Sequence, residues 1–211
     1  MQRRMTGSAL LAIALAMVPG AMGWRMAHAT VKPALPAAPT EQDPKAAAKT
    51  PGDPKRIARG EYLVKTMGCH DCHTPHKLGP KGPERDMSRA LTGHPEGLVM
   101  PPGPKLPAGP WVWVGAGTMT AFSGPWGVSF TANLTPDPET GLGKWTEDMF
   151  ITAMKTGRHE GKGRPILPPM PYFVVAELND EDIKSLFAYL QSLPPVKNRV
   201  PQPVDPPESG R

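Results

Sequence analysis

The sequence predicts one helical domain with a loop-rich insert, flanked by proline-rich ends. Amphipathic segments with helix-capping residues lie near both ends of residues 54–195, which we predict as the domain. The middle of this region is too rich in proline and glycine for a long helix. A region of this length can bury one core.

The first predicted helix begins at Asp53-Pro54, because Asp is a good N-cap and Pro suits the first helical position. Gly68 ends it. Gly60 lies inside the helix, where glycine costs up to about 1 kcal/mol, so we expect a close helix–helix contact there. Apolar residues at roughly helical spacing support the helix: Ile57, Tyr62, Val64 and Met67.

Two further helices follow the middle region. One runs from Thr146 to Thr156, with Thr146 as N-cap and Gly157 as its end. The last helix is capped by Asn179 and stopped by Pro194-Pro195. Its apolar residues recur at three- and four-residue steps: Ile183, Leu186, Phe187, Leu190 and Leu193.

The insert, residues 92–144, contains nine of the 29 prolines. Two short strands, Trp111–Val114 and Gly127–Phe130, are predicted to form a hairpin within it.

The N-terminal end predicts export. A basic start, an apolar run from Ala9 to Val18 and an A-x-A site at 27–29 favour a signal peptide over residues 1–29. Cleavage after Gly23 is an alternative, and an uncleaved signal would tether the protein to a membrane. Residues 30–53 are predicted to be a Pro/Ala-rich linker, and residues 196–211 a disordered Pro-rich tail.

The only two cysteines belong to Cys69-His70-Asp71-Cys72-His73, which reads C-x-x-C-H. This is the pattern of covalent c-type haem attachment, in which both thiols bind the haem and the histidine ligates its iron. A redox dithiol needs a βαβ context, which is not visible. A zinc site completed by His73 and His76 would crowd four ligands into eight residues, whereas structural zinc pairs are usually well separated. One motif predicts one haem c, with the insert covering part of it.

The sixth iron ligand is predicted to be Met170, which lies among prolines ahead of the last helix, 97 residues after His73. A Met/His pair raises the reduction potential and leaves no vacant site. Met67, Met149 and Met154 are expected in the core. The rival ligands are Met100, His76, His94 and His159.

These residues resemble the class I c-type cytochromes of the bacterial periplasm. The resemblance rests on Gly60-Glu61-Tyr62-Leu63, on residues 69–75 and on Pro168-Pro169-Met170-Pro171. Residues 133–146 look like the haem modules of dehydrogenase cytochrome c subunits, which often carry three modules where this chain has one. The resemblance implies an all-α haem fold, with the first and last helices crossing near Gly60 and Tyr189.

The resemblance also implies roles for particular residues. Cys69 and Cys72 would form the thioether bonds, with His73 as proximal and Met170 as distal ligand. Trp145 and Arg158 are further residues expected to approach the haem or its propionates, although Trp145 also fits a plain core position.

The expected function is electron transfer rather than catalysis. A periplasmic monohaem carrier would take single electrons from a dehydrogenase or quinol-linked complex and pass them to another cytochrome or a terminal oxidase. The alternatives are a haem enzyme or gas sensor with an open or displaceable sixth position, and a fixed subunit of a larger complex. Membrane contact is expected only if the signal is uncleaved.

The charge balance argues against a nucleic-acid partner. The chain has 24 Lys and Arg against 19 Asp and Glu, and removing the predicted signal leaves 21 against 19. Two local clusters could still steer an acidic redox partner, with an ordinary solvated surface as the alternative: Lys77, Lys81, Arg85 and Arg89, and Lys155, Arg158, Lys162 and Arg164.

Overall fold

The computed structural model describes residues 52–104 and 106–206, which belong to one compact unit. The predicted signal peptide and nearly all of the predicted linker lie outside the described residues. Within the described ranges, no helix is both long and apolar enough to cross a membrane.

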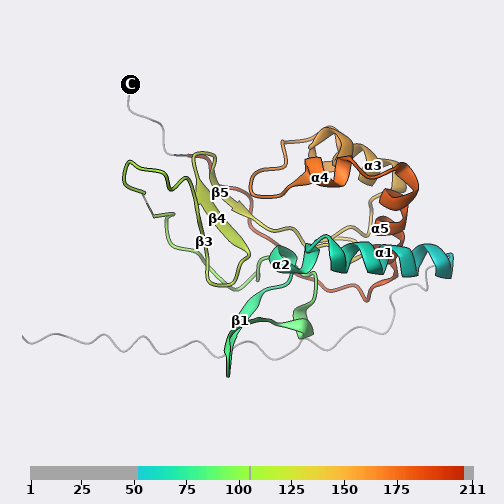
Figure 1. The fold of residues 1–211 in the computed structure, drawn as a ribbon, viewed down its shortest axis with the longest axis horizontal. Coiled ribbons are helices and arrows are strands. Elements are labelled where there is room, and N and C mark those ends of the chain that lie inside the picture. The colour runs from blue at the N-terminus through green and yellow to red at the C-terminus, as the bar shows by residue number, and fades with distance from the viewer. Residues whose placement is uncertain (1–51, 105, 207–211) are drawn as a thin grey trace, which may run out of the picture. The chain divides into compact units, whose positions relative to one another are not determined.

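The two longest helices, α1 (Pro54–Thr66) and α5 (Asp180–Ser192), pack across each other, as predicted (Figure 1). A Cβ added at Gly60 would overlap the backbone carbonyl of Ser185 and lie 2.7 Å from Tyr189 Cβ. The helices therefore meet at backbone distance, which explains a glycine in the middle of α1.

The predicted caps are present. The side chains of Asp53, Thr146 and Asn179 accept hydrogen bonds from first-turn backbone N–H groups at 3.0, 3.2 and 2.8 Å. Helix α3 (Glu147–Thr156) ends at Gly157, whose left-handed conformation suits glycine. The local sequence signals therefore set the bounds of all three predicted helices.

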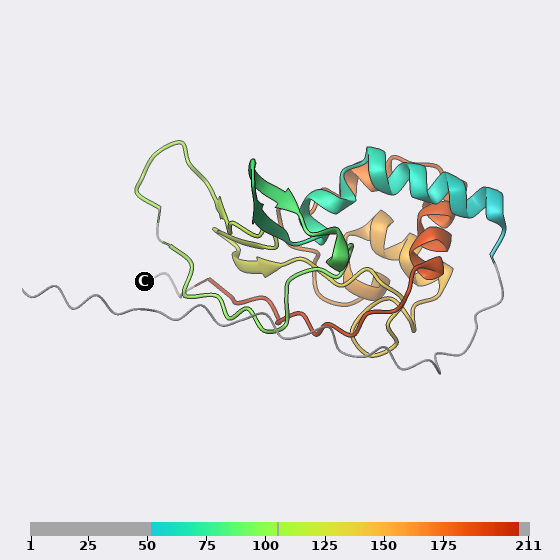
Figure 2. The ribbon, with the colours of Figure 1, turned by 90° about the horizontal axis from the view of Figure 1, so that it is seen from below.

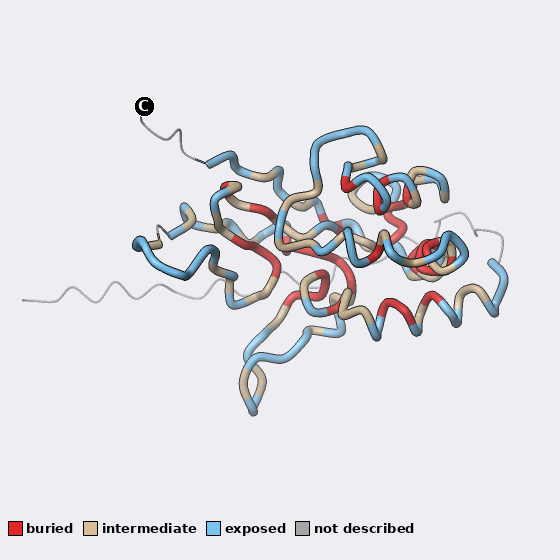
Figure 3. The backbone as a smooth tube through the Cα atoms, turned by 45° about the horizontal axis from the view of Figure 1, so that its top comes forward, coloured by how far each residue is buried: buried red, intermediate tan, exposed pale blue. Residues whose placement is uncertain are grey.

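Shorter helical elements complete the helical half of the unit: α2 (Cys69–His73), η1 (Met87–Arg89), η2 (His159–Gly161) and α4 (Tyr172–Ala176). The aromatic rings of Phe150 in α3 and Phe187 in α5 lie 5.2 Å apart in the core. Figure 3 shows buried positions recurring along one face of α1, which packs on this core. The central side chains of this core are Leu63, Val64, Phe150, Ile183, Leu186, Phe187 and Leu190.

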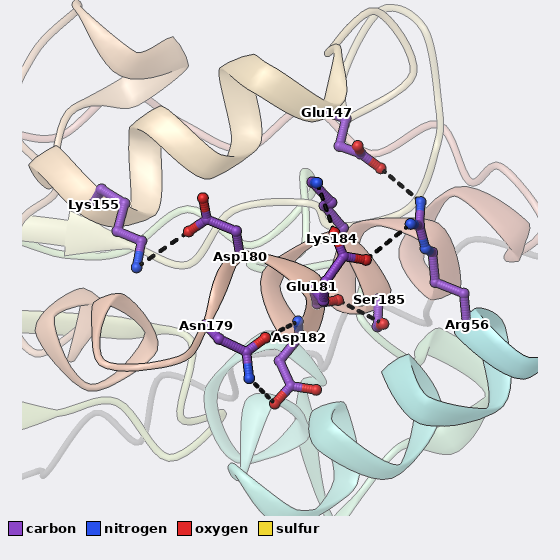
Figure 4. A network of polar contacts seen from close by, with 9 residues as sticks. All are labelled: Arg56, Glu147, Lys155, Asn179, Asp180, Glu181, Asp182, Lys184 and Ser185. Atoms are coloured by element: carbon purple, nitrogen blue, oxygen red, sulfur yellow. Dashed lines mark hydrogen bonds and ion pairs between the residues drawn. The ribbon is translucent and has the colours of Figure 1, made fainter.

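Ion pairs connect helices α1, α3 and α5 (Figure 4). Arg56 of α1 contacts Glu147 of α3 at 3.3 Å and Glu181 of α5 at 3.0 Å. Lys155 of α3 lies 3.5 Å from Asp180 of α5. These side chains are substantially exposed, so each pair contributes about 0–1 kcal/mol, and apolar packing dominates the contact.

Two small antiparallel sheets accompany the helices. β1 (His76–Gly79) pairs with β2 (Gly82–Arg85) directly after α2. β3 (Val114–Gly115), β4 (Ala121–Gly124) and β5 (Gly127–Phe130) form a second sheet in the order β3-β4-β5. The helices agree with the all-α framework. Strands were predicted only within the insert, so the β1–β2 hairpin was not predicted.

The predicted hairpin is partly wrong. The strand Gly127–Phe130 has the predicted bounds, but it pairs with β4 rather than with residues 111–114. β4 and β5 are joined by only Pro125 and Trp126, so their pairing closes a much shorter loop than the predicted one. Of the first predicted strand, only Val114 belongs to a strand.

The C-terminal segment, residues 196–206, is ordered against the domain and is not the predicted disordered tail. Figure 2 shows it running from α5 back toward the second sheet. The Asn198 side chain is 4% exposed and donates to the carbonyl oxygens of Thr92 and His94 at 2.7 and 2.8 Å. Val204 and Val128 exchange backbone hydrogen bonds of 2.8 and 2.9 Å. Non-local hydrogen bonds hold this segment, and its own composition does not reveal them.

Candidate haem-binding site

A cavity of about 490 Å³ lies between the helices, the second sheet and the segment that contains Met170. Its volume falls within the roughly 300–1,000 Å³ typical of cofactor sites. Its lining is mainly apolar and includes Val64, Phe122, Leu134, Phe150, Met154, Ile166, Leu186 and Leu190.

The short helix α2 places both cysteines on this cavity. Gly68 adopts a left-handed conformation (φ 71°) that separates α1 from α2, and the Asp71 N–H donates to its carbonyl oxygen at 2.8 Å. Cys69 and Cys72 both line the cavity. Burial raises the pKa of the Cys69 thiol to about 11 and also raises the pKa of Cys72, so both thiols are protonated near neutral pH.

His73 is buried at the end of α2 and also lines the cavity. Its Nδ1 lies 2.8 Å from the carbonyl oxygen of Ala132, two residues after β5. A carbonyl only accepts, so Nδ1 carries the proton and Nε2 is left as the electron-pair donor. Burial lowers the His73 pKa, which favours the neutral imidazole that binds iron.

Met170 lines the same cavity from the proline-rich segment ahead of α4. The segment is attached to the second sheet, because the Ser129 hydroxyl of β5 donates to the Pro168 carbonyl oxygen at 2.6 Å. The Met170 N–H donates to the Leu167 carbonyl oxygen at 3.3 Å. The structure thus brings Cys69, Cys72, His73 and Met170 together around one cavity.

The rival iron ligands are placed differently. His76, His94 and Met100 do not line the cavity. His94 is buried with both ring nitrogens engaged, Nδ1 with Thr120 Oγ1 at 3.0 Å and Nε2 with the Leu98 carbonyl oxygen at 2.9 Å. Among the rivals only His159 lines the cavity, where its ring packs edge-on against Trp145 with centroids 5.2 Å apart.

The two further predicted residues are separated. Trp145 lines the cavity beside the start of α3, whereas Arg158 is exposed outside it and donates to the Gly163 carbonyl oxygen at 3.1 Å. Arg164 is instead the one Lys or Arg among the described residues that line the cavity, and burial lowers its pKa. The sequence pattern placed Arg164 in a basic surface cluster. The only sequence feature that could have indicated its position on the cavity is that it lies in the segment leading to Met170.

The insert and the C-terminal segment contribute more of the cavity than the sequence indicated. Trp113, Met119, Phe122 and residues 129–134 line it from the insert, and Pro203 lines it from the C-terminal segment. The cavity is therefore completed by residues far apart in the chain, on both sides of the last helix.

A C-x-x-C-H helix that directs two thiols and an oriented histidine into an apolar cavity, with a methionine on the same cavity, defines a c-type cytochrome domain. Residues 57–194 match the cytochrome c family model, and the chain belongs to this family.

Relatives of this chain include components of dehydrogenases. The chain is 41% identical over 81 residues to a subunit of the nicotinate dehydrogenase of Pseudomonas putida, covering 38% of this chain and 7% of that relative. It is 30% identical over 152 residues to the alcohol dehydrogenase (quinone) cytochrome c subunit of Gluconobacter oxydans, covering 71% and 24%. It is 27% identical over 167 residues to a diheme cytochrome c-type protein of Cereibacter sphaeroides, covering 79% and 45%. Each match spans less than half of the relative's own length.

Membership of the family implies covalently bound haem c, and the residues present fit it. The two cysteines line an apolar cavity of cofactor size, the His73 Nδ1 bond to Ala132 leaves Nε2 as the electron-pair donor, and Arg164 adds one basic side chain to the lining. Membership of the cytochrome c family gives the chain an electron-transfer role. Its relatives include cytochrome c subunits of dehydrogenases.

Proposed function

We propose that this chain is a monohaem c-type cytochrome of the bacterial periplasm that carries single electrons, with His73 and Met170 as the iron ligands. The observation that carries the proposal is that both side chains line one apolar cavity together with Cys69 and Cys72. The single attachment motif supports one haem, and the N-terminal export signals support the periplasm.

Bound haem supplies a one-electron iron couple, and the chain's own residues set its conditions. The Ala132 carbonyl holds the His73 ring in one tautomer and makes Nε2 a stronger donor. The thioether of Met170 favours the ferrous state, which raises the reduction potential. The apolar lining limits access of water, so a change of charge at the iron is less well solvated and the surrounding groups control its potential.

Arg164 is the proposed cation for a haem propionate, in place of the predicted Arg158. It lines the cavity, although the residue as a whole is exposed, and its Nη1 donates to the Pro165 carbonyl oxygen at 3.3 Å. A carboxylate beside it would be partly neutralised.

The proposed electron donor is a dehydrogenase or quinol-linked complex, and the acceptor another cytochrome or a terminal oxidase. The named dehydrogenase subunits among the relatives support this choice. In this role the chain performs no substrate chemistry itself.

The visible spectrum of the haem-loaded exported protein tests the proposal. We expect a low-spin ferric haem with the weak red charge-transfer band of methionine ligation, and no shift when carbon monoxide is added to the reduced form. Met170→Ala should lose the band and bind carbon monoxide. The control Met100→Leu, which changes a methionine outside the cavity, should behave as wild type.

Other outcomes would redirect the proposal. A high-spin wild-type spectrum, or ready binding of carbon monoxide, would indicate an open sixth position and favour a haem enzyme or gas sensor. Loss of the band in Met100→Leu instead of Met170→Ala would show that Met100, and not Met170, is the ligand.

A further inference from the structure

The insert contains a long stretch almost without charge. Between Glu96 and Asp137 the sequence has one charged residue, Lys105, although 20% of the whole chain is charged and 40 residues at that average would carry eight. The same stretch contains three of the five tryptophans. An ordinary solvated loop has no need of this composition, because charged side chains normally cover exposed surface.

Large apolar side chains of this stretch are exposed. Val99 is 88% exposed, Trp111 75%, Val112 58% and Trp113 44%. Figure 3 shows exposed positions following one another along the loop before the second sheet. We call Val99–Pro104 and Trp111–Trp113 together the insert face.

A groove accompanies the insert face. It has a volume of about 260 Å³ and lies between residues 100–104 and the second sheet. None of its described lining residues is charged: Met100, Pro101, Pro102, Gly103, Pro104, Val114, Gly115, Ala116, Ala121, Phe122, Ser123 and Val128. A Cβ added at Gly103 would meet Ser123 Cβ at 2.8 Å, so the loop lies close against β4.

The insert face is continuous with the haem cavity. Phe122 lines both the groove and the cavity, so the two meet at this side chain. Trp113 is exposed on one side, lines the cavity on the other and packs edge-on against Phe122 with centroids 5.7 Å apart. An occupant of the groove would therefore lie beside the cavity and not at a remote surface.

We propose that the insert face is the docking surface for a permanent, non-diffusing protein partner that presents a neutral, apolar surface. This inference rests on the proposed electron-transfer function and makes the chain a fixed subunit instead of a free carrier. Interface cores are depleted in charge and enriched in tryptophan and methionine, which is the composition found here. Desolvating such a surface leaves no buried charge without a partner.

Electrostatics distinguish this partner from a diffusing one. Transient redox partners are steered by charged surfaces, but the insert face contains no charged residue. The predicted basic cluster after the attachment motif is also partly neutralised, because Lys77 pairs with Asp86 and Arg85 with Asp71. A membrane-surface segment would carry several Lys or Arg residues beside its aromatic side chains, and this stretch carries one.

The test uses the full chain, expressed with its haem in its own host. The variant Trp111→Glu/Val112→Glu adds two charges to the insert face without altering a residue that lines the cavity. The matched control is Leu78→Glu, which adds a charge at an apolar residue that is 87% exposed on the β1–β2 hairpin. Detergent extracts are separated by size in 1 M NaCl, where charges are screened beyond about 3 Å, and the haem is followed by its absorbance.

We expect wild type and Leu78→Glu to elute with a larger complex in 1 M NaCl. The double variant should leave at least tenfold less haem in that complex, with an unchanged spectrum. A photo-crosslinking amino acid at position 112, but not at position 78, should then join the haem-stained chain to a polypeptide of the same complex.

Three outcomes would overturn the docking inference: elution of the wild type as a free monomer, a position-112 adduct with a second copy of this chain, or binding of the wild type to protein-free lipid vesicles that the double variant loses. These outcomes leave the His/Met spectrum intact, so the electron-carrier proposal would survive them. A high-spin spectrum would instead overturn the electron-carrier proposal, whatever the elution.

Discussion

We predict that the Asn198 side chain anchors the C-terminal segment to the domain, and replacing Asn198 tests whether its hydrogen bonds stabilise the folded protein. Its Nδ2 donates to the carbonyl oxygens of Thr92 and His94 at 2.7 and 2.8 Å, and its Oδ1 accepts from the Glu96 N–H at 2.9 Å. The side chain is almost fully buried, so water does not replace these bonds when they are removed.

Asn198→Ala should destabilise the haem-loaded protein by about 3 kcal/mol. Each of the three hydrogen bonds contributes about 1 kcal/mol net, which gives this total. Counting instead the cost of leaving the three buried backbone groups without a partner gives a similar total. For a domain of this size the loss corresponds to a fall in Tm of about 6–12 °C. Asn198→Asp should cost at least as much, because it keeps the acceptor, loses both donors and buries a charge.

Thermal unfolding of the haem-loaded protein, followed by far-ultraviolet circular dichroism, measures this loss. The control is Lys197→Ala, the neighbouring residue, whose exposed 3.0 Å ion pair with Glu139 contributes about 0–1 kcal/mol. If Asn198→Ala melted within about 2 °C of Lys197→Ala, well short of the expected fall in Tm, the assignment of this side chain as the fastening point would be refuted.

Three further predictions concern the helices and the cavity. Gly60→Ala should destabilise by about 3 kcal/mol, measured by denaturant unfolding, because the new Cβ overlaps backbone and α1 must move; a neutral effect would contradict the close helix crossing. Arg164→Gln should lower the reduction potential by roughly 20–60 mV, up to about 1.4 kcal/mol, because a nearby cation stabilises the reduced haem. Arg158→Gln, at a residue that does not line the cavity, should leave the potential unchanged, and equal shifts would remove Arg164 from its proposed role. The hydrogen bond from Arg59 lowers the Asp182 pKa, so the ionised carboxylate stabilises the fold at pH values above its ordinary pKa, near pH 4. This contribution is lost as the pH falls further. Arg59→Ala should therefore make acid unfolding begin at higher pH, and an unchanged acid midpoint would count against the pair.

Local signals were sufficient for the helical framework. The caps at Asp53, Thr146 and Asn179 and the apolar spacing predicted three helices that the structure contains. The attachment motif and the proline-flanked methionine predicted side chains that share one cavity. Each of these signals lies within a few residues along the chain, which is the range that sequence patterns report.

The missed features depend on contacts between distant residues. β4 is only four residues long and is defined by pairing with β3 and β5. The C-terminal segment is polar and proline-rich, so its order comes from Asn198 and from backbone pairing of Val204 with Val128. Arg158 and Arg164 are both arginines and lie close together in the sequence, and only the tertiary structure shows which one lies on the cavity.

The position of Pro203 has a consequence for the order of assembly. The attachment motif comes early in the chain, whereas the C-terminal segment that contributes Pro203 to the cavity is the last described part to be synthesised. Without that segment, the cavity lacks the part of its lining that Pro203 provides. The lining of the cavity is therefore complete only when residues on both sides of α5 are in place.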